Sequence, residues 1–205
     1  MSTPIIFLVE ANSTKTYHVK KNDSLSLIAV DLIDKSTNSR LLVNLEEYAE
    51  CQIEVFILNN GYAKNIQIEI IHHSFVNSNT IVKALSAHRG ETKINLINKT
   101  PPNTKKITQN QIVDAILFDQ TSRIIVTPSM LIDTNIIKAS HAVNIGNINP
   151  EQLFYLMSRG VSKSKAITTI LQGMFISLMK NSSTNDLYNK ALTVLKRMIK
   201  GNNGN

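Results

Sequence analysis

The chain has few cysteine and aromatic residues: 205 residues include one cysteine, no tryptophan and 5% Phe, Tyr and Trp together. The single thiol, Cys51, excludes an intrachain disulfide and any metal site that needs several of the chain's own thiolates. Thiolates for such a site would have to come from another protein. We expect Cys51 to be a small buried residue in a strand. The lack of tryptophan also disfavours sugar binding by ring stacking.

Long apolar runs are absent as well. The apolar start at residues 4–9 has no basic region before it and is too short for a signal peptide, and no run approaches the roughly 18 residues of a membrane span. We therefore expect a soluble, cytoplasmic protein with no membrane partner. The length suits one sizeable core, or one core with a small appended domain.

Positive charge is concentrated at one end of the chain. The net charge is +7, and residues 150–205 carry eight Lys or Arg against two acidic residues, which accounts for +6 of it. This quarter is predicted to be a distinct unit with its own surface. Three interpretations stay open for that surface: a solvated helix face, a docking surface for an acidic protein groove, or a nucleic-acid site. The last is disfavoured, because no aromatic-rich strand, basic arm or recognition helix accompanies the charge.

Catalytic motifs are also missing. The sequence has no Gly-rich phosphate loop, no Gly-x-Ser-x-Gly and no His-Glu-x-x-His, so we expect a chain that is not an enzyme and does not hydrolyse ATP. Asp114, Asp119 and Asp133 could serve a glycosidase, but nothing pairs two of them. His72 and His73 are adjacent in a strand and must point to opposite faces, which disfavours a metal site there.

Short strands are the dominant pattern from the N-terminus to about residue 148. β-branched residues alternate with polar ones, as in residues 51–58 and 65–71, and Asn-, Ser- and Thr-rich turns separate the runs. No helical period interrupts them, which disfavours a doubly wound fold. Alternation alone leaves a sandwich, a barrel and a β-helix open.

A helical region follows at residues 149–205. Asn149 is an N-cap candidate, Pro150 suits the first helical position, and Glu151 places negative charge at the positive end of the helix dipole. Gly160 is expected to end this helix in a left-handed conformation. A second helix is predicted after Ser162 and a third from about 185 to 200, each with one apolar stripe.

The run from residue 140 to 167, SHAVNIGNINPEQLFYLMSRGVSKSKAI, resembles the SufB/SufD family of iron–sulfur cluster assembly scaffold subunits. The matching residues are Ser140, His141, Ala142, Gly146, Glu151, Gln152, Leu153, Phe154, Tyr155, Leu156, Ser158, Arg159 and Gly160. A weaker likeness extends upstream through Gln111, Ile116, Leu117, Pro128 and Leu131. The chain is most similar to the SufD members. The resemblance implies a right-handed parallel β-helix core at residues 1–148 and a C-terminal helical domain at 149–205.

The resemblance also implies a function and its residues. The chain would be a non-catalytic scaffold subunit that pairs with a SufB-like subunit and docks a SufC-like ABC ATPase. His141 would lie at the subunit interface as an iron ligand or proton-handling group, and no cofactor would be tightly bound to the chain alone. Iron or an iron–sulfur cluster would be held there transiently, because an imidazole can ligate iron beside thiolates from the partner. The docking residues would be Gln152, Phe154, Tyr155 and Arg159.

Several alternatives accompany this hypothesis. Phe154 and Tyr155 are adjacent and point about 100° apart, so we expect one of them to be buried locally and the other to contact a partner. The alternative is that both belong to the domain core, with the Tyr155 hydroxyl reaching the surface. Without the resemblance, His141 would be a satisfied histidine at a strand end. Ala139 stands where some SufD proteins have Cys, and the family's N-terminal helical segment is absent, so the chain would be a short, divergent member. The competing functions are a β-solenoid interaction module without cluster chemistry and a basic nucleic-acid binder. The expected oligomer is a hetero-oligomer, with a homodimer as the alternative.

Overall fold

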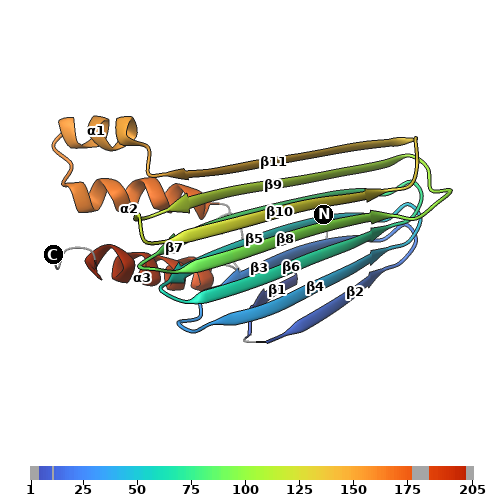
Figure 1. Cartoon of the computed structure of the whole chain (residues 1–205), viewed down its shortest axis with the longest axis horizontal. Helices are drawn as coiled ribbons and strands as arrows, with labels where there is room; N and C mark the ends of the chain where they lie inside the picture. The colour runs from blue at the N-terminus through green and yellow to red at the C-terminus, as the bar shows by residue number, and fades with distance from the viewer. Residues whose placement is uncertain (1–4, 11, 177–184, 202–205) are drawn as a thin grey trace.

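The computed structural model describes residues 5–10, 12–176 and 185–201. Eleven strands precede three helices in it (Figure 1). The odd-numbered strands are β1 (Ile5–Leu8), β3 (Ser24–Asp31), β5 (Glu50–Asn60), β7 (Asn77–Ala87), β9 (Ile107–Leu117) and β11 (Ile137–Asn147). The even-numbered strands are β2 (Thr14–Val19), β4 (Thr37–Leu45), β6 (Ala63–His72), β8 (Glu91–Thr100) and β10 (Arg123–Ile132).

The strands form a parallel β-solenoid. Odd strands build one sheet in the order β1-β3-β5-β7-β9-β11, and even strands build the other in the order β10-β8-β6-β4-β2. Every paired strand is parallel to its neighbour, and each coil contributes one strand to each sheet. Of the architectures that alternation left open, the solenoid is therefore the correct one. The predicted all-β core followed by a short helical region is confirmed.

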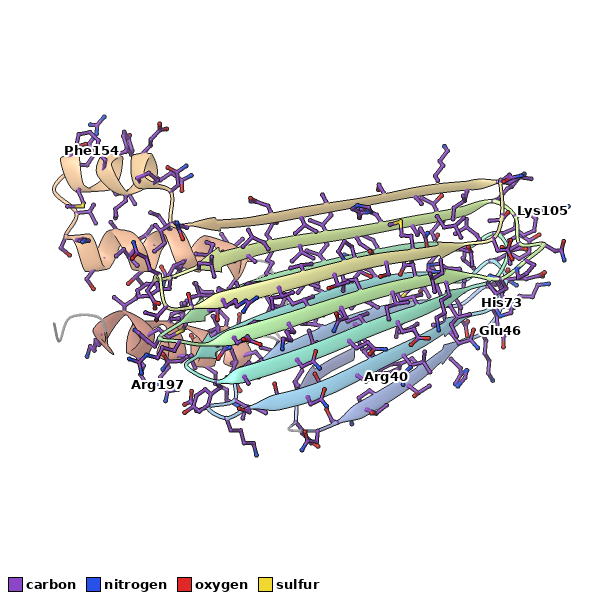
Figure 2. The ribbon with its side chains drawn as sticks, viewed as in Figure 1. Arg40, Glu46, His73, Lys105, Phe154 and Arg197 are labelled. Atoms are coloured by element: carbon purple, nitrogen blue, oxygen red, sulfur yellow. The ribbon has the colours of Figure 1, made fainter. Side chains whose placement is uncertain are left out.

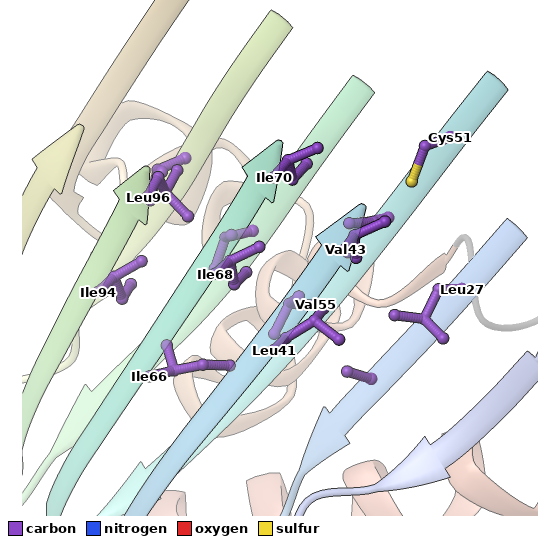
Figure 3. Packing of buried hydrophobic residues seen from close by; sticks show 14 of the residues in the cluster. Leu27, Leu41, Val43, Cys51, Val55, Ile66, Ile68, Ile70, Ile94 and Leu96 are labelled. Carbon is purple, nitrogen blue, oxygen red and sulfur yellow. The ribbon is translucent and has the colours of Figure 1, made fainter. Parts of the chain in front are cut away.

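The space between the two sheets is filled by aliphatic side chains from alternate positions of each strand (Figure 3). Val43, Ile53, Val55, Ile68 and Ile94 are among the buried members of this cluster. Strand pairing in register stacks each of them on an equivalent residue of the next coil, so the alternation seen in the sequence becomes a continuous apolar interior.

The corners of the solenoid place non-glycine residues in the left-handed region. Tyr48 and Phe75 have φ near +62° at equivalent corners, and their rings stack with centroids 4.7 Å apart. Lys21 and Lys106 lie over the outer faces of the two rings, at 5.5 and 5.9 Å from the centroids. Left-handed backbone costs roughly 1–2 kcal/mol for such residues, and stacking with cation–π contact offsets a similar amount.

Three helices lie at one end of the molecule: α1 (Pro150–Ser158), α2 (Lys163–Met174) and α3 (Asn185–Gly201). A second apolar cluster joins Leu171, Phe175 and Leu195 to Phe56 and Leu85 on the outer face of the odd-strand sheet. The helices therefore cover that face near the ends of β5 and β7, while α1 stands apart from it (Figure 1). The division into domains at residue 148 stays a prediction, because α2 and α3 share a core with the sheet.

The local signals for α1 are confirmed. The Asn149 Oδ1 atom accepts hydrogen bonds from the backbone N–H groups of Glu151 (2.8 Å) and Gln152 (3.2 Å). Gly160 has φ +81° after the last turn. Ser162 occupies the N-cap position of α2, but its side chain makes no capping hydrogen bond. Among the described helices, none is both long and apolar enough to cross a membrane.

Candidate functional site: the open end of the solenoid and helix α1

The last coil, formed by β10 and β11, leaves one end of the solenoid open. Each of these strands pairs on one side only within the described part of the chain, with β8 and β9 respectively. The side chains in this coil are exposed where equivalent positions in inner coils are buried: Ile132, Val143 and Ile145 are each about 40% exposed. Unpaired strand edges beside exposed aliphatic side chains are typical of a surface that another chain covers.

His141 lies in the middle of β11, on the inward-facing side of this coil. Its register partner is Gln111, and the same inward positions hold Val113 in β9 and Val143 in β11. Because the coil is terminal, the His141 side chain is exposed, and it has no hydrogen-bond partner among the described residues. Its neighbour Ser140 faces outward and donates a hydrogen bond from Oγ to the Asn110 Oδ1 atom (2.8 Å). The imidazole is therefore exposed and available to contact a partner.

Three buried polar residues, Thr80, Gln109 and Gln111, face the interior next to this end of the solenoid and are called the polar floor. Gln109 and Gln111 are each 1% exposed and face inward, and Thr80 occupies the same row one coil further in. Several of their side-chain atoms have no hydrogen-bond partner: Thr80 Oγ1, Gln109 Oε1 and Nε2, and Gln111 Oε1. Asn98 Nδ2, from the facing strand β8, is also unpartnered. Unpartnered buried polar atoms also occur elsewhere in the described chain, at Ser39 Oγ, Asn44 Oδ1 and His88 Nε2, but those of Thr80, Gln109 and Gln111 lie in the coils that lead to the open end. A buried polar atom without a partner calls for an explanation other than packing.

Cys51 lies in the same interior, further from the open end, and its thiol is expected to be unreactive. Its side chain is 4% exposed, and burial raises the pKa of its thiol to about 12. Its register partner Ser78 contacts the buried imidazole of His72, with 2.7 Å between Oγ and Nε2. A thiol with a raised pKa is a poor nucleophile. The expectation of a small buried residue in a strand is confirmed.

Helix α1 presents the second candidate surface. Gln152, Phe154, Tyr155 and Arg159 are all exposed, and the helix buries none of its residues. Phe154 is 73% and Tyr155 58% exposed, and Figure 2 labels Phe154 at the outer corner of the molecule. The expectation that one ring of this pair is buried locally is wrong, and so is the alternative that both belong to the core, because α1 packs on α2 and not on the sheet. The Arg159 guanidinium lies 5.5 Å from the Tyr155 ring centroid.

The structure keeps these two candidate surfaces separate. His141 is in mid-strand, whereas α1 begins after β11 has ended.

The carboxylates considered for a glycosidase are not paired: Asp119 shapes a turn, where it accepts backbone N–H bonds from His88 (2.6 Å) and Thr121 (2.8 Å). The described residues contain no group of three or more His, Cys, Asp or Glu side chains that could hold a metal ion.

The buried glutamines are the feature that sequence reasoning missed. Gln109 and Gln111 alternate with Thr108, Asn110 and Ile112, so polarity alone could not show which of them face inward. The alternation of the strand could have shown this. Val113 is aliphatic and therefore inward-facing, and residues two and four positions before it, Gln111 and Gln109, must face the same way.

The fold defines the chain as a parallel β-solenoid with a short C-terminal helical region, and comparison with known proteins names the family. Residues 9–174 match the family model described as the SUF system FeS cluster assembly, SufBD core domain. The chain belongs to this family. It is 25% identical over 138 residues to the iron–sulfur cluster assembly protein SufD of Bacillus subtilis, covering 67% of this chain and 32% of that protein.

Two further relatives share the family name. A SufBD family protein of Pyrococcus horikoshii is 34% identical over 83 residues, which is 40% of this chain and 19% of the relative. One from Staphylococcus epidermidis is 27% identical over 122 residues, covering 59% of this chain and 26% of the relative. The chain thus spans a third or less of the length of the curated relatives it matches. The resemblance to the SufB/SufD family, and to SufD in particular, is confirmed.

Proposed function

We propose that this chain is a non-catalytic, SufD-like scaffold subunit in the assembly of iron–sulfur clusters. The observation that carries the proposal is the open β10–β11 end, where His141 is exposed on the inward side of a SufBD core solenoid. The iron–sulfur cluster is the cargo in this proposal and not a resident cofactor. The site of action is cytoplasmic.

The open end would pair with a SufB-like subunit. Backbone N–H and C=O groups along β10 and β11 can bond to strands of the partner, and the exposed side chains of Ile132, Val143 and Ile145 can complete the apolar interior. Edge pairing of this kind buries His141 between the two chains. Thiolates of the partner would then supply the ligands that this chain lacks, with His141 contributing a neutral nitrogen.

Helix α1 would dock a SufC-like ABC ATPase. Phe154 and Tyr155 offer adjacent exposed rings, a residue type enriched at the centres of protein interfaces. Arg159 stacks on Tyr155 and adds positive charge at the end of the helix. Helix α1 packs on α2, and α2 packs with α3 on the odd-strand sheet. A movement of the ATPase bound to α1 would therefore be transmitted through α2 to the solenoid.

The test is co-expression of the full chain with the SufB-like and SufC-like proteins of its own organism, followed by gel filtration. We expect a stoichiometric complex of all three proteins. Val143→Lys places a charge in the paired interior and should release the SufB-like subunit, while Asn144→Lys, one residue along and facing outward, should not. Phe154→Ala with Tyr155→Ala should release the ATPase alone.

The role of His141 is tested in the assembled complex. His141→Ala should leave the complex intact and abolish cluster assembly, whereas Ser140→Ala, on the outward face of the same strand, should assemble clusters normally. A chain that elutes alone would overturn the scaffold proposal. A complex in which His141→Ala still assembles clusters would leave a β-solenoid interaction module without cluster chemistry.

A further inference from the structure

Gln111 carries a buried acceptor that nothing in the described structure satisfies. The residue is 1% exposed, and its Oε1 atom has no hydrogen-bond partner. An unsatisfied buried polar group costs about 1–3 kcal/mol, so a leucine of similar size would serve a purely structural position better. The amide is therefore expected to have a partner in the working protein.

Strand register identifies the donors within reach. Thr80, Gln111 and His141 occupy one row across β7, β9 and β11, all on the inward face. Neighbouring strands lie about 4.8 Å apart, which places the Gln111 amide between the Thr80 hydroxyl and the His141 ring. Thr80 Oγ1 is itself buried without a partner. A side-chain carbonyl has two lone pairs, so Gln111 can accept one hydrogen bond from each neighbour.

We infer that Gln111 is a positioning residue for His141. The Gln111 Oε1 atom accepts a hydrogen bond from the protonated ring nitrogen of His141, so that the other ring nitrogen, which carries a lone pair, faces the open end. This inference rests on the proposed role of His141. Histidines that bind a metal commonly donate their other ring N–H to a carbonyl or carboxylate, which fixes the tautomer and the ring orientation. Gln111 is the buried carbonyl in register with this ring.

Gln109 supplies a matched control. It lies two residues away in the same strand, is equally buried, and also has unpartnered amide atoms. Its register partner in β11 is Ala139, which has no donor in its side chain. A change at Gln109 therefore perturbs the polar floor equally without touching the contact proposed for His141.

The experiment follows the ring N–H proton of His141 by NMR in the full chain labelled with ¹⁵N-histidine, at alkaline pH where imidazole is neutral. We expect the His141 ring N–H to exchange with water at least about tenfold more slowly than a ring N–H of the exposed His73. The buried His72 ring gives a separate protected signal. His141→Ala assigns the signal. Gln111→Leu should remove the protection, Gln111→Glu should retain it because a carboxylate also accepts, and Gln109→Leu should leave it unchanged.

The outcomes separate this inference from the proposed function. An unprotected His141 ring in the wild-type chain, or protection that survives Gln111→Leu, overturns the positioning role even if His141→Ala abolishes cluster assembly. If the ring N–H is protected in the wild type and Gln111→Leu removes the protection, the positioning role is supported, even if the His141→Ala complex still assembles clusters. That last result would contradict only the proposed role of His141 in cluster assembly.

Discussion

At the scale of single residues, His72 links stability to pH. Its imidazole is fully buried between Ser78 Oγ and the Lys99 carbonyl oxygen, and burial lowers its pKa to about 4. An unfolded chain binds a proton there near pH ~6.5, so between these two values the unfolded state holds more protons than the folded state. The stability contributed by neutral His72 is therefore complete above ~6.5 and is lost as the pH falls toward 4.

We predict a loss of about 3 kcal/mol in the free energy of unfolding from this residue between neutral pH and pH ~4. Urea unfolding of the wild type and of His72→Gln at a series of pH values would measure it as the part of the pH dependence that the variant lacks. His73→Gln is the control, since His73 is exposed and adjacent. Equal pH dependence in all three proteins would contradict the prediction.

Residue roles divide by whether they depend on local or distant neighbours. Asn149 and Gly160 could be assigned from the sequence because a helix cap involves residues only two or three positions away. The exposure of both Phe154 and Tyr155 could not, because it depends on where α1 lies relative to the sheet. The partnerless amide of Gln111 was hidden for the same reason: its neighbours, Thr80 and His141, are about thirty residues away on either side.

At the scale of elements, the stability of α1 should affect docking without affecting the fold. Asn149→Ala removes the side-chain acceptor for two N–H groups of the first turn and destabilises the helix by about 1 kcal/mol. Because α1 buries no residue, the melting temperature should not change. If α1 docks the ATPase, its affinity should fall about fivefold.

Calorimetric titration with the ATPase and thermal unfolding would measure the two effects separately. Asn147→Ala, an exposed change at the end of β11, controls for loss of an asparagine near the helix. A drop in melting temperature with unchanged affinity would show that α1 supports the core and does not dock a partner.

Helices and strands were predictable to different degrees. The three helices fall close to their predicted positions, because apolar spacing and caps are local signals. The strands were recognised as strands, but their alternation fits a sandwich, a barrel and a solenoid equally. What separates these folds is which strand pairs with which, a property of residues 22 to 32 positions apart in this chain. Only the family resemblance favoured the solenoid in advance.

At the scale of the whole molecule, each sheet of the solenoid has an edge strand at both ends, β1 or β2 at one end and β11 or β10 at the other. Inner strands such as β5 and β7 pair on both sides, and the helices cover part of their outer face. The terminal strands β10 and β11 pair on one side only among the described strands, and their inward side chains are partly exposed. In a repeat architecture stability comes from contacts between adjacent coils, so a coil with one neighbour opens more readily than a coil with two.

Amide hydrogen exchange read by mass spectrometry should therefore report the interface directly. In the isolated chain, peptides from β10 and β11 should exchange at least about tenfold faster than those from β5 and β7. The SufB-like partner should slow exchange in β10 and β11 and leave β2, the even-sheet edge strand at the opposite end, unchanged. Protection that appears at β2 instead would place the partner at the other end of the solenoid, away from His141, and would remove the physical basis for its role in cluster assembly.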